Sequence, residues 1–223
     1  MPTIRGIIRR GVVVPALRES ILKQGPSRNI INLEWGTFWA TNRKYIDPAA
    51  PRHTSVAAFR AVSCTVQGLS ELSVVEKPKH GKSADLGTKK VVYDKTILLE
   101  QADAKSFELD EEITLMNWGN AYVRGTTNDA DGNVTGLDLE LNLVGDVKKT
   151  KKKVTWLATS NNNLVPIDLV SFDYLITKDK LEKQDELENC LTPVTEFRTQ
   201  AFTDCNVAGL PQGAIIQFER KGF

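Results

Sequence analysis

A regular alternation of leucine with polar residues is the pattern that most limits how this chain can fold. Leu137, Leu139, Leu141 and Leu143 alternate with two acidic side chains and one asparagine. Successive side chains of a β-strand point to opposite faces, so residues 137–143 are predicted to form a strand with one buried and one wet face.

Further short stretches of β-branched and apolar residues follow one another after Pro51, separated by Gly, Asn, Asp and Pro. They cover residues 62–66, 91–93, 97–99, 113–116 and 154–157. Many short strands at this spacing favour an antiparallel barrel or sandwich over a parallel sheet. The predicted fold class is mainly β with a small N-terminal α part.

Helical patterns occur mostly before Pro51. A first helix is expected over 15–25, where Pro15 suits the first turn and Gly25 ends it. A second is expected over about 32–45, with Trp35, Phe38 and Trp39 at helical spacing and therefore in the core. A polar segment over 177–189 predicts a third helix, on the surface.

The same N-terminal region is strongly basic. Residues 1–53 hold nine Lys and Arg against three Asp and Glu, although the whole chain has a net charge of only +1. Such an asymmetry predicts a surface that faces a polyanion. A solvated helical face would give the same count, and it remains the alternative at this point.

Length and composition exclude several classes of protein. The 223 residues suffice for one large β domain or two to three small ones. No apolar run approaches the ~18–20 residues that cross a bilayer, and the N-terminus has no signal-peptide pattern. The three cysteines are widely spaced, which suits a reducing compartment, so a cytosolic protein without membrane contact is expected.

No catalytic or metal site is predicted. His53 and His80 are the only histidines, and neither has a cysteine at zinc-ligand spacing. The segment 129–133 resembles a calcium loop faintly, but Asp131-Gly132 between two strands indicates a hairpin turn. No Ser/His/acid or Cys/His arrangement stands out.

Two lysine clusters are open to two interpretations each. The run of Lys148, Lys149, Lys151, Lys152 and Lys153 precedes a predicted strand, where lysine either protects a sheet edge or contacts a phosphate backbone. The second cluster lies within residues 77–90 near Pro and Gly, and it is expected to form a solvated loop rather than a phosphate-binding surface.

Several longer blocks occur together along nearly the whole chain: residues 2–11 (PTIRGIIRRG), 16–19 (ALRE), 24–29 (QGPSRN), 46–53 (IDPAAPRH), 120–123 (NAYV), 151–157 (KKKVTWL) and 213–223 (GAIIQFERKGF). In these blocks the sequence resembles class I glutamyl-tRNA synthetases of the eukaryotic and archaeal type. Glutaminyl enzymes share the Pro-Thr-Ile, Arg-Arg-Gly, Ala-Pro-Arg and Gln-Phe-Glu-Arg elements, so they remain the alternative. The blocks at 24–29 and 46–48 favour glutamate.

The resemblance implies a domain organisation. Residues 1–52 would form a helical stem-contact domain and residues 53–223 two anticodon-binding β-barrels. The proximal barrel would combine about 53–105 with 190–223, and about 106–189 would form the distal barrel. The family's ATP-binding signatures, His-Ile-Gly-His and Lys-Met-Ser-Lys-Ser, do not occur in this chain.

The resemblance also implies a function. The chain would be the C-terminal, tRNA-binding portion of a cytosolic glutamate–tRNA ligase, inactive alone, with ATP and Mg bound only by the full-length enzyme. Its expected partners are the glutamate tRNA, the catalytic domain and proteins of a synthetase complex. A β-barrel module that docks acidic proteins is the alternative from a different class.

Site residues follow from the resemblance and from charge. Arg52 and Gln217 are implied to contact the middle anticodon base, with Arg220 close by. Asn117 or Trp118 would offer an amide or a stacking face where glutaminyl relatives have an Arg, although Trp118 suits a core equally well. Contacts to the tRNA stem and backbone are expected from six basic residues: Arg5, Arg9, Arg10, Lys149, Lys151 and Lys153.

Overall fold

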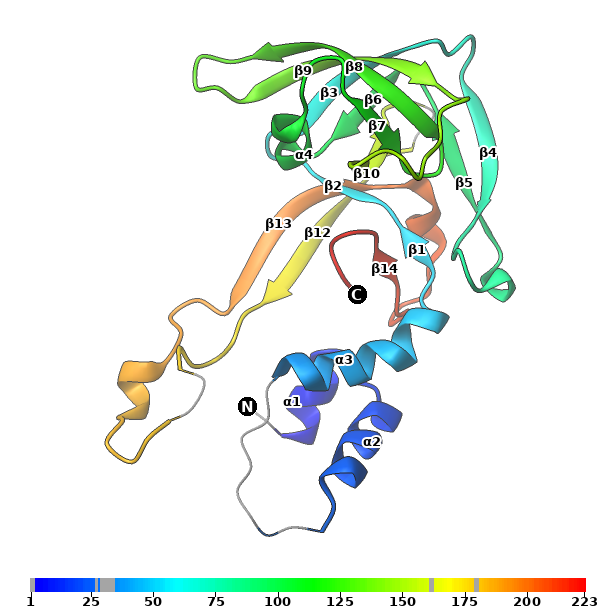
Figure 1. Cartoon of the computed structure of the whole chain (residues 1–223). Helices are drawn as coiled ribbons and strands as arrows, with labels where there is room; N and C mark the ends of the chain where they lie inside the picture. The colour runs from blue at the N-terminus through cyan, green and yellow to red at the C-terminus, as the bar shows by residue number, and fades with distance from the viewer. Residues whose placement is uncertain (1–2, 27, 29–34, 161–162, 179–180) are drawn as a thin grey trace. The chain divides into compact units, whose positions relative to one another are not determined.

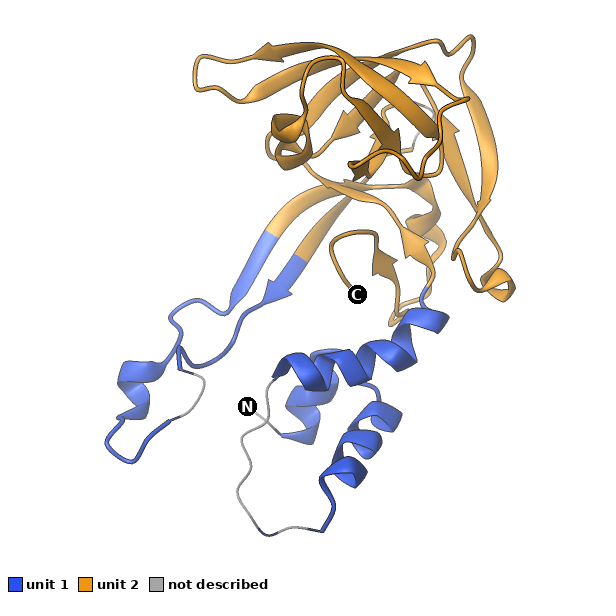
Figure 2. Cartoon of the chain, in the orientation of Figure 1, with its two compact units in different colours: residues 1–50, 170–198, 223 blue, residues 51–169, 199–222 orange. Residues whose placement is uncertain are grey.

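The computed structural model describes residues 3–26, 28, 35–160, 163–178 and 181–223. They form two compact units (Figure 2): residues 1–50, 170–198 and 223 belong to the first, and residues 51–169 and 199–222 to the second. No helix within these described ranges is long and apolar enough to cross a membrane.

The first unit begins with helices α1 (Ile4–Arg9), α2 (Val14–Gln24) and α3 (Trp35–Ile46), followed by the 3-10 turn η1 (Asp47–Ala49). Pro15 lies in the first turn of α2, and Gly25 ends it with a φ of +69°, so the helix predicted over 15–25 is confirmed. The second predicted helix is confirmed from Trp35 onward, and its predicted start at 32–34 lies outside the described residues.

Asn42 ties the three helices together. Its side chain is 2% exposed. The amide oxygen accepts from the Val13 N–H at 2.9 Å, and the amide nitrogen donates to the Gly11 carbonyl at 3.0 Å. Both partners lie in the turn between α1 and α2, so a single buried amide fixes how α3 meets that turn.

The aromatic side chains of α3 differ from the prediction. Trp35, Phe38 and Trp39 contact one another, with ring centroids 5.8–6.1 Å apart, but all three are only half-buried. The expectation of a closed core was therefore too strong. The buried apolar side chains of this region are smaller ones: Val12, Ala16, Ile46 and Ala50.

The second unit is built on a seven-stranded sheet in the order β10-β7-β8-β9-β3-β6-β11 (Figure 1). Its strands are β3 (Val62–Gln67), β6 (Thr96–Leu99), β7 (Glu112–Leu115), β8 (Gly119–Asn128), β9 (Val134–Asn142), β10 (Lys153–Val154) and β11 (Trp156–Ala158). The two edge strands, β10 and β11, are separated only by Thr155. A continuous stretch of chain therefore supplies both edge strands of the sheet, and the sheet nearly closes into a barrel.

The strand predicted over residues 137–143 is β9, and its leucine side chains become more exposed toward the C-terminal end of the strand. Leu137 and Leu139 are 3% and 0% exposed, Leu141 is half-buried, and Leu143, just beyond the strand, is 60% exposed. The alternation predicted the strand and its buried face correctly but extended that face too far. The Asp129 carboxylate accepts from the Asp131 and Asn133 N–H groups, which confirms the predicted hairpin turn between β8 and β9.

The remaining strands form three small sheets. β4 (Ser73–Pro78) pairs with β5 (Thr88–Tyr93), and β12 (Val165–Phe172) lies beside β13 (Glu196–Thr203), which pairs with β2 (Ser55–Ala57). β1 (Arg52–His53) pairs in parallel with β14 (Gln217–Phe218). Short helical elements complete the order: α4 (Gln101–Ser106), η2 (Ala84–Leu86), η3 (Leu187–Cys190) and η4 (Cys205–Gly209).

One prediction of local structure was wrong, and another was right only in part. The described residues of 177–189 contain a turn and the start of η3 instead of a surface helix, since the Asp185 carboxylate accepts from the Glu182 N–H and from Lys178. A segment that is polar all round has no apolar stripe to hold a helix against a core. The solvated loop expected within 77–90 is confirmed only in part: residues 79–87 connect β4 and β5, whereas Lys77, Lys89 and Lys90 lie in the two strands and Lys89 is 4% exposed.

Strand pairing also bears on the expected barrels. The segments 52–57 and 196–218 pair through β1–β14 and β2–β13. However, β3 and β6 pair with β9 and β11 in one sheet. Strands from before and after residues 105–106 therefore share one sheet, and the expected division into a proximal and a distal barrel stays a prediction.

Candidate nucleic-acid interface

The parallel pair β1–β14 brings together two residues that are 165 positions apart in sequence. Arg52 is the register partner of Gln217, and His53 is the partner of Phe218. The Gln217 N–H donates to the Pro51 carbonyl at 2.9 Å, and the Glu219 N–H donates to the His53 carbonyl at 2.9 Å. Paired residues point to the same face of a sheet, so Arg52 and Gln217 share one face, and both are half-buried.

A pair of two-residue strands is too short to hold its own geometry. A group of five buried side chains lies within and next to this pair, and we call it the buried polar cluster: His53, Thr54, Lys89, Asp204 and Glu219. Their exposed fractions lie between 0% and 9%. Burying a polar group costs free energy unless it is hydrogen-bonded, so the hydrogen bonds within the cluster hold the segments that carry it in place.

Asp204 is the main acceptor of this cluster. Its carboxylate accepts from the Thr54 N–H at 2.8 Å and lies 3.2 Å from His53 Nδ1. Asn206 donates to the same carboxylate through both its backbone N–H and its side chain. Burial alone would raise the pKa of Asp204, but these hydrogen bonds outweigh it and hold the pKa below its ordinary value of 3.8.

Lys89 is the buried cation of the cluster. Its Nζ donates to the Arg52 carbonyl at 2.8 Å and lies 3.6 Å from Glu219 Oε2. The same Glu219 oxygen accepts from the Thr54 hydroxyl at 3.2 Å. The backbone of Arg52 is thereby linked to the residue two positions after Gln217.

Arg220 is already engaged within the second unit. Its guanidinium makes two hydrogen bonds to the Asp103 carboxylate, at 2.5 and 2.7 Å, which raise the pKa of the guanidinium further. Its backbone has a φ of +67°, a conformation that needs support from its surroundings. The side chain remains 42% exposed, so part of it faces solvent.

Asn117 and Trp118 lie in the turn between β7 and β8, and the structure separates their roles. Tyr93 stacks on Trp118 with ring centroids 4.8 Å apart, and Trp156 lies 4.7 Å from the same ring. Trp118 is therefore part of the packing against the core, while Asn117 is exposed and its carbonyl accepts from the Tyr93 hydroxyl at 2.6 Å.

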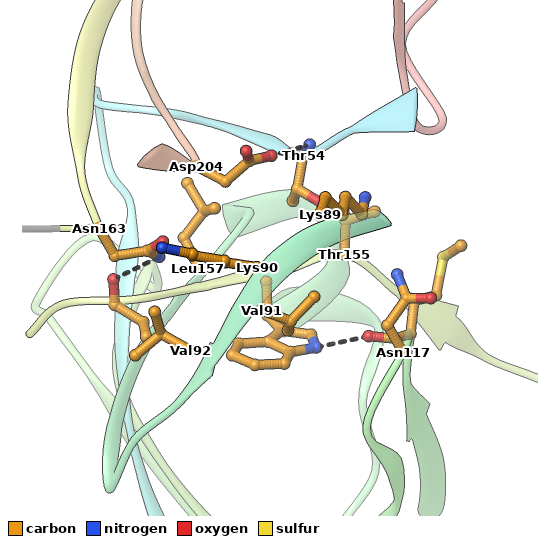
Figure 3. Close-up of a pocket in the computed structure, with 13 residues that line it drawn as sticks. Thr54, Lys89, Lys90, Val91, Val92, Asn117, Thr155, Leu157, Asn163 and Asp204 are labelled. Carbon is orange, nitrogen blue, oxygen red and sulfur yellow. Dashed lines mark hydrogen bonds between the residues drawn. The ribbon is translucent and has the colours of Figure 1, made fainter. Parts of the chain in front are cut away.

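A small cavity lies beside this turn (Figure 3), lined by Asn117, Lys89, Thr54 and Asp204 among others. Its volume of about 30 Å³ is well below the roughly 150 Å³ of a cavity that binds benzene. A nucleobase cannot enter such a space, so this cavity is not a binding pocket for a base.

The lysines before β11 differ in their surroundings: one makes contacts within the fold, and the others face solvent. Lys152 is half-buried, donates to Glu111 at 2.6 Å and to the Ser106 carbonyl, and lies over the Phe107 ring. Lys149, Lys151 and Lys153 are exposed. Because β10 is an edge strand, Lys153 both protects that edge and remains available to an anion.

In the first unit, Arg5 and Arg9 are exposed on α1. Arg10 is half-buried: its guanidinium donates to the Asp173 carbonyl at 2.8 Å and lies over the Phe172 ring at 6.0 Å. Of the three arginines predicted to contact a backbone, two are therefore fully available and one is partly used within the unit.

Sequence reasoning missed most of the buried polar cluster. His53 was considered only as a metal ligand, and Lys89 was assigned to a solvated loop. Among the described residues, no three His, Cys, Asp or Glu side chains lie close enough to hold a metal ion. Burial raises the pKa of the Cys64 thiol to about 12, so this cysteine is unreactive near neutral pH.

Comparison with known proteins gives two family matches and a set of relatives. Residues 50–142 and 153–223 match two families that carry the same description, "tRNA synthetases class I (E and Q), anti-codon binding domain". The chain is 54% identical over 223 residues to a probable cytoplasmic glutamate--tRNA ligase of Schizosaccharomyces pombe, and 50% identical over 225 residues to the cytoplasmic glutamate--tRNA ligase of Saccharomyces cerevisiae.

A bifunctional glutamate/proline--tRNA ligase of Mus musculus is 37% identical over 223 residues. Each alignment covers the whole of this chain, but only 31% of the two fungal proteins and 15% of the mouse protein. The chain therefore spans about a third of the length of the fungal relatives it matches.

Proposed function

The chain belongs to the class I glutamyl- and glutaminyl-tRNA synthetase family, to its anticodon-binding region, and on that premise we propose that it reads the anticodon of the glutamate tRNA. It would act as the C-terminal portion of a glutamate–tRNA ligase, which joins glutamate to its tRNA with ATP. The names of the fungal relatives favour glutamate over glutamine and a cytoplasmic location.

The observation that carries this proposal is the pairing of Arg52 with Gln217. Unpaired anticodon bases are splayed out and read on their edges. A uridine edge presents one N–H donor between two carbonyl acceptors. The Gln217 amide offers both a donor and an acceptor, and the Arg52 guanidinium offers only donors, so the two together match the middle uridine that the resemblance implies.

Arg220 and Asn117 extend the same reading surface. A guanidinium has five N–H donors, and the two hydrogen bonds from Arg220 to Asp103 leave others for an RNA oxygen. Asn117 presents its amide from an exposed turn, whereas both neighbours of the Trp118 ring are aromatic. We assign the amide of Asn117, and not the Trp118 ring, to contact with a neighbouring base.

Backbone contacts would come from exposed basic residues that carry no base information. Arg5 and Arg9 on α1 would contact the tRNA stem, and Arg10 would add to them with the part of its guanidinium that Asp173 does not use. Lys149, Lys151 and Lys153 would contact phosphates near β10. Such contacts set affinity and its dependence on salt.

The cofactors and protein partners that we propose are those of the full-length ligase. ATP and Mg would bind to the catalytic domain, and this chain would bind neither. That domain would be the chain's constant partner. The mouse relative's name joins two ligases in one protein, which favours further contact with other synthetases.

Binding of the whole 223-residue chain to transcripts of the glutamate tRNA tests the proposal. We expect tight binding that weakens steeply as salt is raised, and a preference of about tenfold or more over the same tRNA with the middle anticodon base changed. A tRNA with the third anticodon base of the glutamine isoacceptor separates the two family members. Equal binding to all anticodons would contradict the proposal.

A further inference from the structure

We propose that Lys89 is a positioning residue for anticodon reading, which sets the backbone of Arg52 relative to Gln217 without touching the RNA. This inference rests on the proposed function and names a residue outside its reading surface. Lys89 lies on β5, a strand that contributes nothing to the β1–β14 pair itself.

Three segments of the second unit meet at this lysine. Its ammonium hydrogen-bonds the Arg52 carbonyl of β1 at 2.8 Å, and it pairs at 3.6 Å with Glu219, which follows β14. The lysine itself comes from β5. If the Arg52 carbonyl changes direction, the peptide that follows Arg52 rotates. The Arg52 side chain then moves relative to Gln217.

Lys89 is itself held in place. The backbone of the next residue, Lys90, is bound twice by Asn206: the side-chain oxygen accepts from its N–H at 2.9 Å, and the side-chain nitrogen donates to its carbonyl at 2.9 Å. On the other side, Lys89 pairs with Lys77 of β4. The ammonium therefore approaches Arg52 from a fixed strand.

Stability alone does not account for a buried lysine here. Burying an ion pair removes both charges from water, and their mutual attraction often does no more than offset this desolvation cost. An apolar pair of equal volume is frequently as stable. Lys89 is 4% exposed and Glu219 is 9% exposed. An ammonium supplies what an apolar residue cannot, namely directed donors that hold a carbonyl and a carboxylate at the same time.

The test compares two anticodon stem-loop RNAs that differ only in the middle base, uridine in one and adenosine in the other. Lys89→Met keeps the length of the side chain and removes its charge and donors. We expect the preference of the chain for uridine to fall about five- to tenfold, within the range of one base contact. Lys90→Met, which removes the same charge from an exposed position of the same strand, serves as the matched control.

Lys89→Met also leaves Glu219 buried without its cation, which destabilises the fold. The double variant Lys89→Met/Glu219→Gln removes that unpaired charge, and its thermal unfolding midpoint should return toward that of the wild type. A positioning role predicts that its preference for uridine stays low. Recovery of the preference together with stability would overturn the inference, since the lysine would then be merely structural.

The outcome also separates this inference from the function on which it rests. If the wild-type chain does not prefer uridine, the proposed function fails. If the wild type prefers uridine and Lys89→Met does so equally, the function stands and the positioning role is wrong. Lys89→Arg, which keeps a buried cation with donors, is expected to retain more of the preference than Lys89→Met.

Discussion

The α1–α3 region and the seven-stranded sheet differ in how they use their apolar residues. The sheet has a continuous buried core to which every one of its strands contributes. In α1 and α2, several large apolar side chains remain exposed, among them Ile4 at 66% and Leu22 at 69%. The helical region also carries the exposed arginines of α1.

The difference matches the two tasks proposed for the chain. Attraction to phosphates acts over distances near the Debye length and tolerates small displacements, so exposed arginines on lightly packed helices suffice. Reading a base requires donors and acceptors placed to within a few tenths of an ångström. Arg52 and Gln217, the residues proposed to read the base, accordingly lie in a strand pair that hydrogen bonds join to a buried polar cluster.

The sharpest test of the comparison is truncation of an apolar side chain in each region. Leu139→Ala in the core of β9 should lower the free energy of unfolding by about 2–5 kcal/mol, because it leaves a cavity in a fully buried site. Leu22→Ala on α2 should change it by about 0.5 kcal/mol or less. Urea unfolding followed by tryptophan fluorescence measures both, and equal losses would contradict the contrast in packing.

A smaller effect is expected within the buried polar cluster. Asp204→Asn should cost about 1.5–3 kcal/mol at pH 7, since the amide cannot replace all the hydrogen bonds that the charged carboxylate accepts. Denaturant midpoints across a pH series measure the loss. Asp131→Asn, at an exposed turn, is the control and should be close to neutral.

The pH dependence of this cost has a defined sign. The pKa of Asp204 is lower in the folded chain than in the unfolded one, so the folded state binds its proton less readily. The stabilisation that the charged Asp204 carboxylate gives the folded state is complete above its ordinary pKa of 3.8. It is lost as the pH falls through the lower pKa that Asp204 has in the folded chain. The difference between wild type and Asp204→Asn should therefore shrink only in acid, and a constant difference would contradict the assignment.

Substitution of Arg52 or Gln217 should affect tRNA recognition more than stability. Arg52→Ala and Gln217→Ala should each cost about 1–3 kcal/mol of binding, mainly against tRNA with the correct middle base. Because the two side chains share one base, the double variant should lose less than the two single losses combined. Binding assays with matched tRNAs measure this, and full additivity would place the two side chains on different contacts.

The smallest effect per residue is expected on α1. Arg5→Ala with Arg9→Ala should weaken binding of every tRNA alike and reduce the slope of affinity against salt by roughly 1–2. Arg9→Ala with Arg10→Ala should reduce the slope less, because Arg10 already donates to Asp173. A loss of affinity that depends on the anticodon would contradict the proposed separation between phosphate contacts on α1 and base recognition by Arg52 and Gln217.

Local patterns predicted the elements that depend on neighbours in sequence. The alternation from Leu137 predicted β9, and Pro15 and Gly25 marked the ends of α2. The segment 177–189 failed because its charge pattern suited a helix, while the turn around Asp185 is held by side-chain hydrogen bonds that periodicity does not reveal. The placement of Lys89 in a solvated loop failed because a buried lysine is rare and its partners come from distant segments.

By itself, the sequence determined that this chain is mainly β, that its first 53 residues are basic, and that its blocks at 46–53 and 213–223 carry the family resemblance. Only the tertiary structure decided that Arg52 and Gln217 are register partners and that Lys89 is bound to the backbone beneath them. The reason is physical: periodicity and charge are properties of contiguous residues. A contact between residues 52, 89 and 217 depends on how the strands close around a core.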